Sequence, residues 1–140
     1  MKVALFPNFG KKNALPTALK CCEILNKLDI KILVPDTYKN EFEEKKYIVY
    51  GAIKEIISEC DIVIAIGGDG TILQASAYAS ECDKLLLGIN TGRLGFMASM
   101  ESDELGNLAR LKRHDYVVET RMMIDAALVR NNEIITQYTA

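Results

Sequence analysis

Two glycine-rich segments carry the residues of this sequence that are best suited to chemistry. The first reads GGDGT at positions 67–71, and the second reads GINTGRLGFM at positions 88–97. Six of the nine glycines of the chain lie in these two segments. Because glycine has no Cβ and tolerates positive φ, such segments let the backbone approach a ligand closely. We therefore expect a ligand site where the two segments meet.

The first segment has the context of a turn between a strand and a helix. The apolar run Ile62–Ile66 precedes it, and the helical pattern of Ile72–Ala79 follows it. The free N–H groups at the start of a helix carry about half a positive charge and can hold a phosphate. The alternative is a simple turn without a ligand, in which Asp69 or Thr71 caps the helix.

Asp69 bears on the choice between these two interpretations. A carboxylate beside bound phosphates is electrostatically unfavourable unless it accepts a proton or holds a metal ion. The combination of an acid with a phosphate-binding turn favours transfer of a phosphoryl group to a hydroxyl, with Asp69 as the base. The segment matches neither the GxxxxGK[ST] phosphate loop nor the GxGxxG dinucleotide fingerprint, so these two nucleotide-binding motifs are excluded.

Four other residues could have a purely structural role instead of a functional one. Asn90 suits a turn, and Phe96 suits a hydrophobic core. Arg93 could contact a phosphate or could be a solvated surface side chain. His114, the only histidine, ends a helical pattern, where a cation complements the helix dipole. We therefore do not treat His114 as catalytic.

Alternating strands and helices must position the two segments. The expected strands are 2–6, 30–34, 62–66 and 85–89, and the expected helices are 15–28, 53–57 and 72–79. Asn13 can cap the first of these helices. Right-handed strand–helix–strand units predict an α/β fold with an open, mainly parallel sheet and flanking helices, similar to the Rossmann type. Both glycine segments then lie at the carboxyl ends of strands, where such sheets bind ligands.

Two stretches depart from this alternation. We expect no core residue in the polar stretch 36–46. Residues 122–129 and 134–138 resemble two antiparallel strands joined at Asn131-Asn132, and an isolated two-stranded ribbon is marginal in water. We therefore divide the chain into an α/β nucleotide-binding domain at 1–115 and, at 116–140, the start of an antiparallel β-rich domain that continues beyond the chain.

Composition narrows the classes of function. The 140 residues are 49% hydrophobic, and 17 basic against 19 acidic side chains give a formal net charge of −2. This balance argues against nucleic-acid and membrane partners, and no apolar run approaches the ~18 to 20 residues of a membrane span or resembles a signal peptide. The four cysteines lack CxxC spacing, which excludes structural zinc and indicates buried thiols in a reducing cytosol, with a reactive thiol as the alternative.

The two glycine-rich segments also resemble motifs of known families. The GGDGT segment is similar to a signature shared by NAD kinases, diacylglycerol and sphingosine kinases and phosphofructokinases. The run NTGRLGF at 90–96 resembles the NTGxLGF segment of NAD kinases, whereas the lipid kinases carry GTxND there. The opening MKVALFPN and the residues ETRMM at 119–123 are also similar to NAD kinases. The resemblance therefore covers nearly the whole chain.

This resemblance implies a reaction and a set of site residues. NAD kinases transfer the γ-phosphoryl group of ATP, or in some members of polyphosphate, to the 2′-hydroxyl of the adenosine ribose of NAD, with Mg²⁺ or Mn²⁺. Asp69 would accept the hydroxyl proton as the catalytic base. The implied binding residues are Gly67, Gly68, Asp69 and Gly70 at the phosphates and NAD, Thr71 as a hydroxyl donor, and Asn90 and Phe96 on the adenosine side. Gln74 stands where some members carry a basic residue, so we expect no charged contact there.

The resemblance also implies that part of the site lies outside this chain. The family's Asn-Glu or Asn-Asp pair and its later glycine-rich motif would follow residue 140. We expect an intact homo-oligomeric, cytoplasmic enzyme that binds small-molecule nucleotides, and a 140-residue fragment that is inactive alone. The alternatives are a nucleotide-binding module without turnover and a lipid kinase that shares GGDGT.

Overall fold

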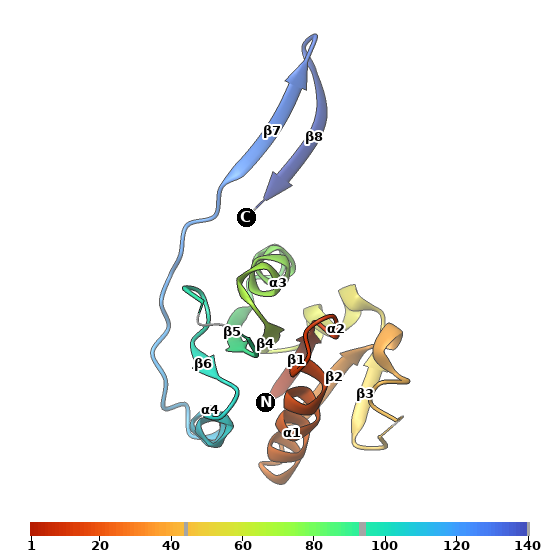
Figure 1. The fold of residues 1–140 in the computed structure, drawn as a ribbon, viewed down its shortest axis with the longest axis vertical. Helices are drawn as coiled ribbons and strands as arrows, with labels where there is room; N and C mark the ends of the chain where they lie inside the picture. The colour runs from red at the N-terminus through yellow and green to blue at the C-terminus, as the bar shows by residue number, and fades with distance from the viewer. Residues whose placement is uncertain (44, 93–94, 140) are drawn as a thin grey trace.

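The centre of the molecule is a parallel sheet of six strands. The computed structural model describes residues 1–43, 45–92 and 95–139. The strands are β1 (Lys2–Pro7), β2 (Lys31–Pro35), β3 (Ile48–Gly51), β4 (Ile62–Gly67), β5 (Leu85–Asn90) and β6 (Met100–Glu101). Their order is β3-β2-β1-β4-β5-β6, with every neighbouring pair parallel (Figure 1). The prediction of an α/β fold with an open parallel sheet is confirmed.

Helices cover both faces of this sheet. They are α1 (Ala14–Lys27), α2 (Ile53–Glu59), α3 (Asp69–Glu81) and α4 (Ala109–Lys112), with the short 3₁₀ helices η1 (Asp36–Tyr38) and η2 (Leu105–Leu108). One buried cluster joins α1, η2 and α4 to one face, and a second joins α2 and α3 to the other (Figure 1). Alternate residues of β1 point to opposite faces, so Val3 and Leu5 enter the first cluster while Ala4 and Phe6 enter the second.

Strand β4 shows why the central strands read as continuous apolar runs. All of its residues are buried, because helices pack on both sides of it. Side chains of Ile62, Ile64 and Ile66 lie in the α1 cluster, and those of Val63 and Ala65 lie in the α2–α3 cluster. The predicted strand 62–66 is therefore confirmed, with Gly67 as its last residue.

Several local predictions were wrong. The polar stretch 36–46 contributes Phe42, which is fully buried and packs edge-on to Phe9 with ring centroids 6.0 Å apart. A single aromatic among charged neighbours can enter a core without any periodic signal. Asn13 occupies the N-cap position of α1, but its side chain makes no capping hydrogen bond. Strands β3 and β6 were not anticipated.

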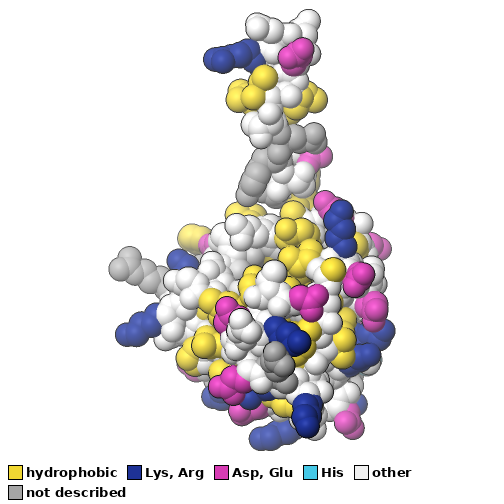
Figure 2. All heavy atoms as spheres, turned by 90° about the vertical axis from the view of Figure 1, so that its right-hand side faces the viewer, with side chains coloured by type: hydrophobic (Ala, Val, Ile, Leu, Met, Phe, Trp, Pro, Cys, Tyr) yellow, Lys and Arg dark blue, Asp and Glu magenta, His cyan; other side chains and the backbone are white. Residues whose placement is uncertain are grey.

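The C-terminal residues form a hairpin that projects from the rest of the molecule. Strands β7 (Asp125–Arg130) and β8 (Glu133–Thr139) pair antiparallel. Asn131 and Asn132 join them with φ of 52° and 62°, the left-handed conformation that a tight hairpin turn requires. Figure 2 shows this hairpin standing above the globular part, with hydrophobic side chains uncovered on it. The predicted antiparallel pair is confirmed, while the domain boundary at 115/116 stays a prediction.

Among the described residues, no helix has both the length and the apolar character needed to cross a bilayer.

Candidate active site

The tips of three neighbouring strands meet at one edge of the sheet. The N–H of Asn8, after β1, donates to the carbonyl oxygen of Ile66 at 2.9 Å. The N–H of Thr91, after β5, donates to the carbonyl oxygen of Gly67 at 3.1 Å. The strand order reverses between β1 and β4, so this edge is the switch point at which open α/β sheets bind ligands.

Gly67 allows the turn to close tightly on α3. A Cβ at this position would lie 2.3 Å from Oγ1 of Thr71, closer than any real Cβ contact. Thr71 itself is 9% exposed, and its Oγ1 accepts a hydrogen bond of 3.1 Å from Nδ2 of Asn8. Because this bond uses Thr71 as the acceptor, the hydroxyl can still donate its own proton. The GGDGT turn is thus tied to the end of β1.

Asn8 is a functional-site candidate that the sequence interpretation missed. Its Oδ1 accepts the N–H of Gly10 at 3.0 Å while its Nδ2 donates to Thr71. The sequence offered only its place directly after a predicted strand, next to Pro7, which indicated a turn.

Asp69 does not cap its helix. Gly68 holds the N-cap position of α3, and the structure has no side-chain cap there, so the capping roles considered for Asp69 and Thr71 were wrong. The Asp69 carboxylate instead reaches the second glycine segment. Its Oδ2 accepts the N–H of Phe96 at 3.1 Å, and its Oδ1 accepts the N–H of Met97 at 3.2 Å. The two predicted segments are therefore in direct contact.

Asn90 is 1% exposed, and both ends of its amide are engaged within the protein. Its Nδ2 donates to the two carboxylate oxygens of Glu101 at 3.0 and 3.2 Å. Its Oδ1 accepts the N–H of Gly92 at 3.2 Å, which is the geometry of an Asx turn. Glu101 was not anticipated, because nothing in a sequence marks the partner of a buried amide eleven residues away.

Phe96 is 96% exposed, so the expectation that it belongs to a hydrophobic core was wrong. The glycines also act differently from expectation, because none of the nine has a positive φ. Their effect is steric. A Cβ at Gly68 or at Gly70 would meet nothing within 4 Å, so both positions border open space. Arg93 lies outside the described residues.

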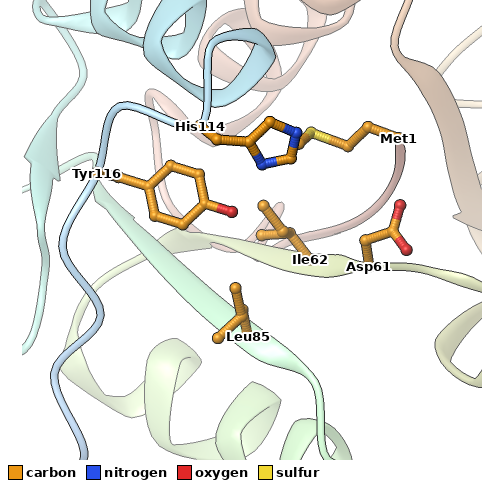
Figure 3. Close-up of a pocket in the computed structure, with 6 residues that line it drawn as sticks. All are labelled: Met1, Asp61, Ile62, Leu85, His114 and Tyr116. Carbon is orange, nitrogen blue, oxygen red and sulfur yellow. The ribbon is translucent and has the colours of Figure 1, made fainter.

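Two cavities lie away from this edge. One, of about 310 Å³, is at the amino ends of the central strands and is lined by Met1, Asp61, Ile62, Leu85, His114 and Tyr116 (Figure 3). The other, of about 360 Å³, lies beside α3 and is lined by Leu73, Gln74, Ala77, Tyr78 and Thr139. Neither contains a residue of the two glycine segments. Within the described parts of the chain, no three His, Cys, Asp or Glu side chains form a group that could hold a metal ion.

Comparisons with known proteins agree with the geometry. The family model of the ATP-NAD kinase N-terminal domain matches residues 3–116. The NAD kinase of Natranaerobius thermophilus is 34% identical over 143 residues, an alignment that covers 99% of this chain and 48% of that protein. The NAD kinase of Thermoanaerobacter sp. (strain X514) is 32% identical over 143 residues, with 99% and 49% covered.

A solved structure shares the fold. The crystal structure of yeast NADH kinase complexed with NADH superimposes with a TM-score of 0.79 at 14% identity, covering 99% of this chain and 45% of that one. The chain spans about half the length of the curated relatives it matches. Since the family model matches most of the residues, the chain belongs to the NAD kinase family, to the part that the N-terminal domain represents.

Proposed function

We propose that the complete gene product is a kinase that phosphorylates the 2′-hydroxyl of the adenosine ribose of NAD, using ATP or polyphosphate, to give NADP. The observation that carries this proposal is the position of Asp69. Its carboxylate stands at the start of α3, at the switch point of the sheet, and contacts the second glycine segment. An acid placed between two glycine-rich loops suits proton abstraction from a hydroxyl that attacks a phosphate.

In the proposed step, Asp69 accepts the proton of the 2′-hydroxyl while the ribose oxygen forms a bond to the γ-phosphorus. The bond from that phosphorus to the bridging oxygen of the donor breaks, and the bridging oxygen leaves with the electron pair. An ionised carboxylate has about four acceptor positions, and two are used by the N–H groups of Phe96 and Met97. A positioned base of this kind contributes ~10² to 10⁴ in rate.

Phosphates would lie beside the start of α3. Open space borders Gly68 and Gly70 at the start of this 13-residue helix, and the N–H groups at the start of a helix can hold a phosphate. The Thr71 hydroxyl has a proton to donate to a phosphate oxygen. A divalent cation held by the phosphate oxygens would neutralise the charge that develops during transfer.

The nucleoside would lie on the side of the second segment. The bare ring of Phe96 offers a flat apolar face against which an adenine can stack. Asn90 supports this side by holding the loop, since Glu101 and Gly92 engage its amide.

We further propose that residues 1–115 act as the nucleotide-binding domain and that 116–140 begin the β-rich NAD-binding domain. The relatives are about twice as long as this chain, and we propose that the corresponding further residues complete that domain, so the 140-residue chain alone is expected to show no turnover. The intact enzyme is proposed to be a cytoplasmic homo-oligomer that acts on small-molecule nucleotides.

Asp69→Asn in the complete gene product tests the proposal. Asparagine keeps the size of the side chain but removes the base, so we expect NADP formation to fall by ~10² or more. NAD affinity, measured by calorimetry, should change only a few-fold. Asp83→Asn is the matched control, because Asp83 is exposed at the far end of α3 and its φ of 51° suits asparagine equally well.

Near-normal turnover in Asp69→Asn would show that Asp69 is not the base. A wild-type product that binds nucleotides without forming NADP would instead identify a binding module.

A further inference from the structure

We infer that the segment Gly95-Phe96-Met97 positions the Asp69 carboxylate. Its two consecutive N–H groups hold the carboxylate in one orientation, and the missing side chain at Gly95 makes that contact possible. The catalytic consequence rests on the proposed function, in which Asp69 is the base. The positioning contact itself is independent of that function.

Two donors on two different oxygens fix a carboxylate more tightly than one. The N–H of Phe96 reaches Oδ2 at 3.1 Å and the N–H of Met97 reaches Oδ1 at 3.2 Å, so rotation of the carboxylate plane would break both bonds. Asp69 and these donors are 27 and 28 residues apart in the sequence. The contact therefore joins two separate loops.

Gly95 lies against the same carboxylate. A Cβ there would lie 2.3 Å from Oδ1, 2.9 Å from Cγ and 3.2 Å from Oδ2 of Asp69. All three atoms of the carboxylate group would have to move. Because the φ of Gly95 is not positive, an alanine at this position would be strained by this contact and not by its backbone conformation.

The segment is anchored near both ends. On one side the Gly92 N–H donates to Asn90, whose amide is held by Glu101. On the other side the Ser99 N–H donates to the carbonyl oxygen of Gly88 at 3.0 Å. The donors to Asp69 thus stand between the end of β5 and the start of β6. Each carboxylate oxygen accepts one N–H from the loop, so each keeps a further acceptor position.

Gly95→Ala and Gly106→Ala form a matched pair of variants for the complete gene product. Gly106 is exposed in η2, outside both glycine segments, and a Cβ there meets nothing within 4 Å, so this second alanine adds the same methyl group away from Asp69. For Gly95→Ala we expect kcat to fall by ~10-fold or more with the KM for NAD within about threefold, because displacing a catalytic group by ~1 Å can cost ~10²-fold. Gly106→Ala should match the wild type in both constants.

A second measurement follows the contact without using turnover. In ¹H–¹⁵N spectra of the 140-residue chain, the amide signals of Phe96 and Met97 should shift in Gly95→Ala and stay in place in Gly106→Ala. Asp69→Asn should also shift at least one of them, because an amide nitrogen cannot accept a hydrogen bond from an N–H. This variant keeps the test valid if Gly95→Ala fails to fold.

The two measurements separate the possible failures. In an enzyme that forms NADP, equal kcat for folded Gly95→Ala and Gly106→Ala overturns the inference. The inference is also overturned if the amide signals of Phe96 and Met97 do not change in Asp69→Asn. If those signals respond as expected but the wild-type product forms no NADP, the positioning contact stands and the proposed function fails.

Discussion

The six-stranded sheet and the C-terminal hairpin are built from the same kinds of apolar residue, yet those residues have opposite surroundings. Ile64 in β4 is 0% exposed, whereas Leu128 in β7 is 59% exposed. Helices pack on both faces of the sheet, and the described residues include no such layer over the hairpin. An apolar pattern therefore specifies strand formation in both regions, but only the presence of covering layers turns the strands into part of a core.

The hairpin pattern itself points to a partner. Val129 and Ile134 pair across the ladder, next to a register irregularity after Leu128, and all three side chains are more than half exposed. A cluster of exposed apolar side chains of this kind is typical of a surface that another part of a protein covers. We therefore expect the longer chain of the family to cover this hairpin.

The largest difference in thermal stability between the two regions should appear when a charge is placed in each of them. Ile64→Asp puts an unpaired carboxylate into the sheet, which costs several kcal/mol and should abolish the cooperative thermal transition. Leu128→Asp, the matched change in the hairpin, should leave the thermal midpoint within about 2 °C. Circular dichroism melts of both variants make this measurement. A folded Ile64→Asp protein would mean that β4 is not the centre of the core.

Thiol labelling should separate buried from accessible positions within the sheet region. Burial raises the pKa of Cys22 from its ordinary 9.0 to about 12, and burial also raises the pKa values of Cys21 and Cys60. Raising the pH from 7 to 9 should therefore create almost no reactive thiolate at Cys21 and Cys22 in the folded chain, and less at Cys60 than at an exposed thiol. Cys82, which is partly exposed, should be alkylated first.

Mass spectrometry after limited alkylation, with and without denaturant, measures the order in which the four cysteines react. All four thiols should react once the chain is unfolded. Rapid labelling of Cys21 in the native protein would contradict the packing of α1 on the sheet.

The smallest effect should come from removing the hairpin. Ending the chain after Tyr116, which still packs against the core, should leave the thermal midpoint nearly unchanged because the hairpin adds few contacts to the sheet. It should reduce self-association, since an uncovered strand pair presents open edges. Light scattering before and after trimming compares the two forms. If the trimmed chain self-associates as strongly as the full chain, the surface responsible for association lies outside the hairpin.

Much of the sheet was predictable because burial on both faces leaves a strong local mark. Ile62–Ile66 and the hairpin turn at Asn131-Asn132 were assigned from apolar runs and turn residues alone. The short β6 was not, because two residues carry no periodicity and pair only where β5 ends. The burial of Phe42 was not predicted either, because a single aromatic residue has no periodicity and its burial depends on where the loop folds back.

The site was predictable in its residues but not in its contacts. Because both glycine segments follow parallel strands, the sequence predicted that they face one another, and the carboxylate of Asp69 does accept the N–H of Phe96. The sequence could not show that the contact runs through backbone N–H groups, which every residue except proline has. It also could not show that Asn8 holds Thr71 or that Glu101 holds Asn90, because these bonds depend on the register of neighbouring strands.

The central position of β1 has a consequence for the order in which the site assembles. The Asp69–Met97 contact closes a loop of 28 residues, but the Asn8–Thr71 contact closes one of 63. The longer closure costs about 0.7 kcal/mol more chain entropy. During synthesis β1 emerges before β2 and can pair with it, yet its other edge stays open until β4 has been made. Strand β1 is therefore both the scaffold of the phosphate side and a strand with an edge open to misassembly while the chain grows.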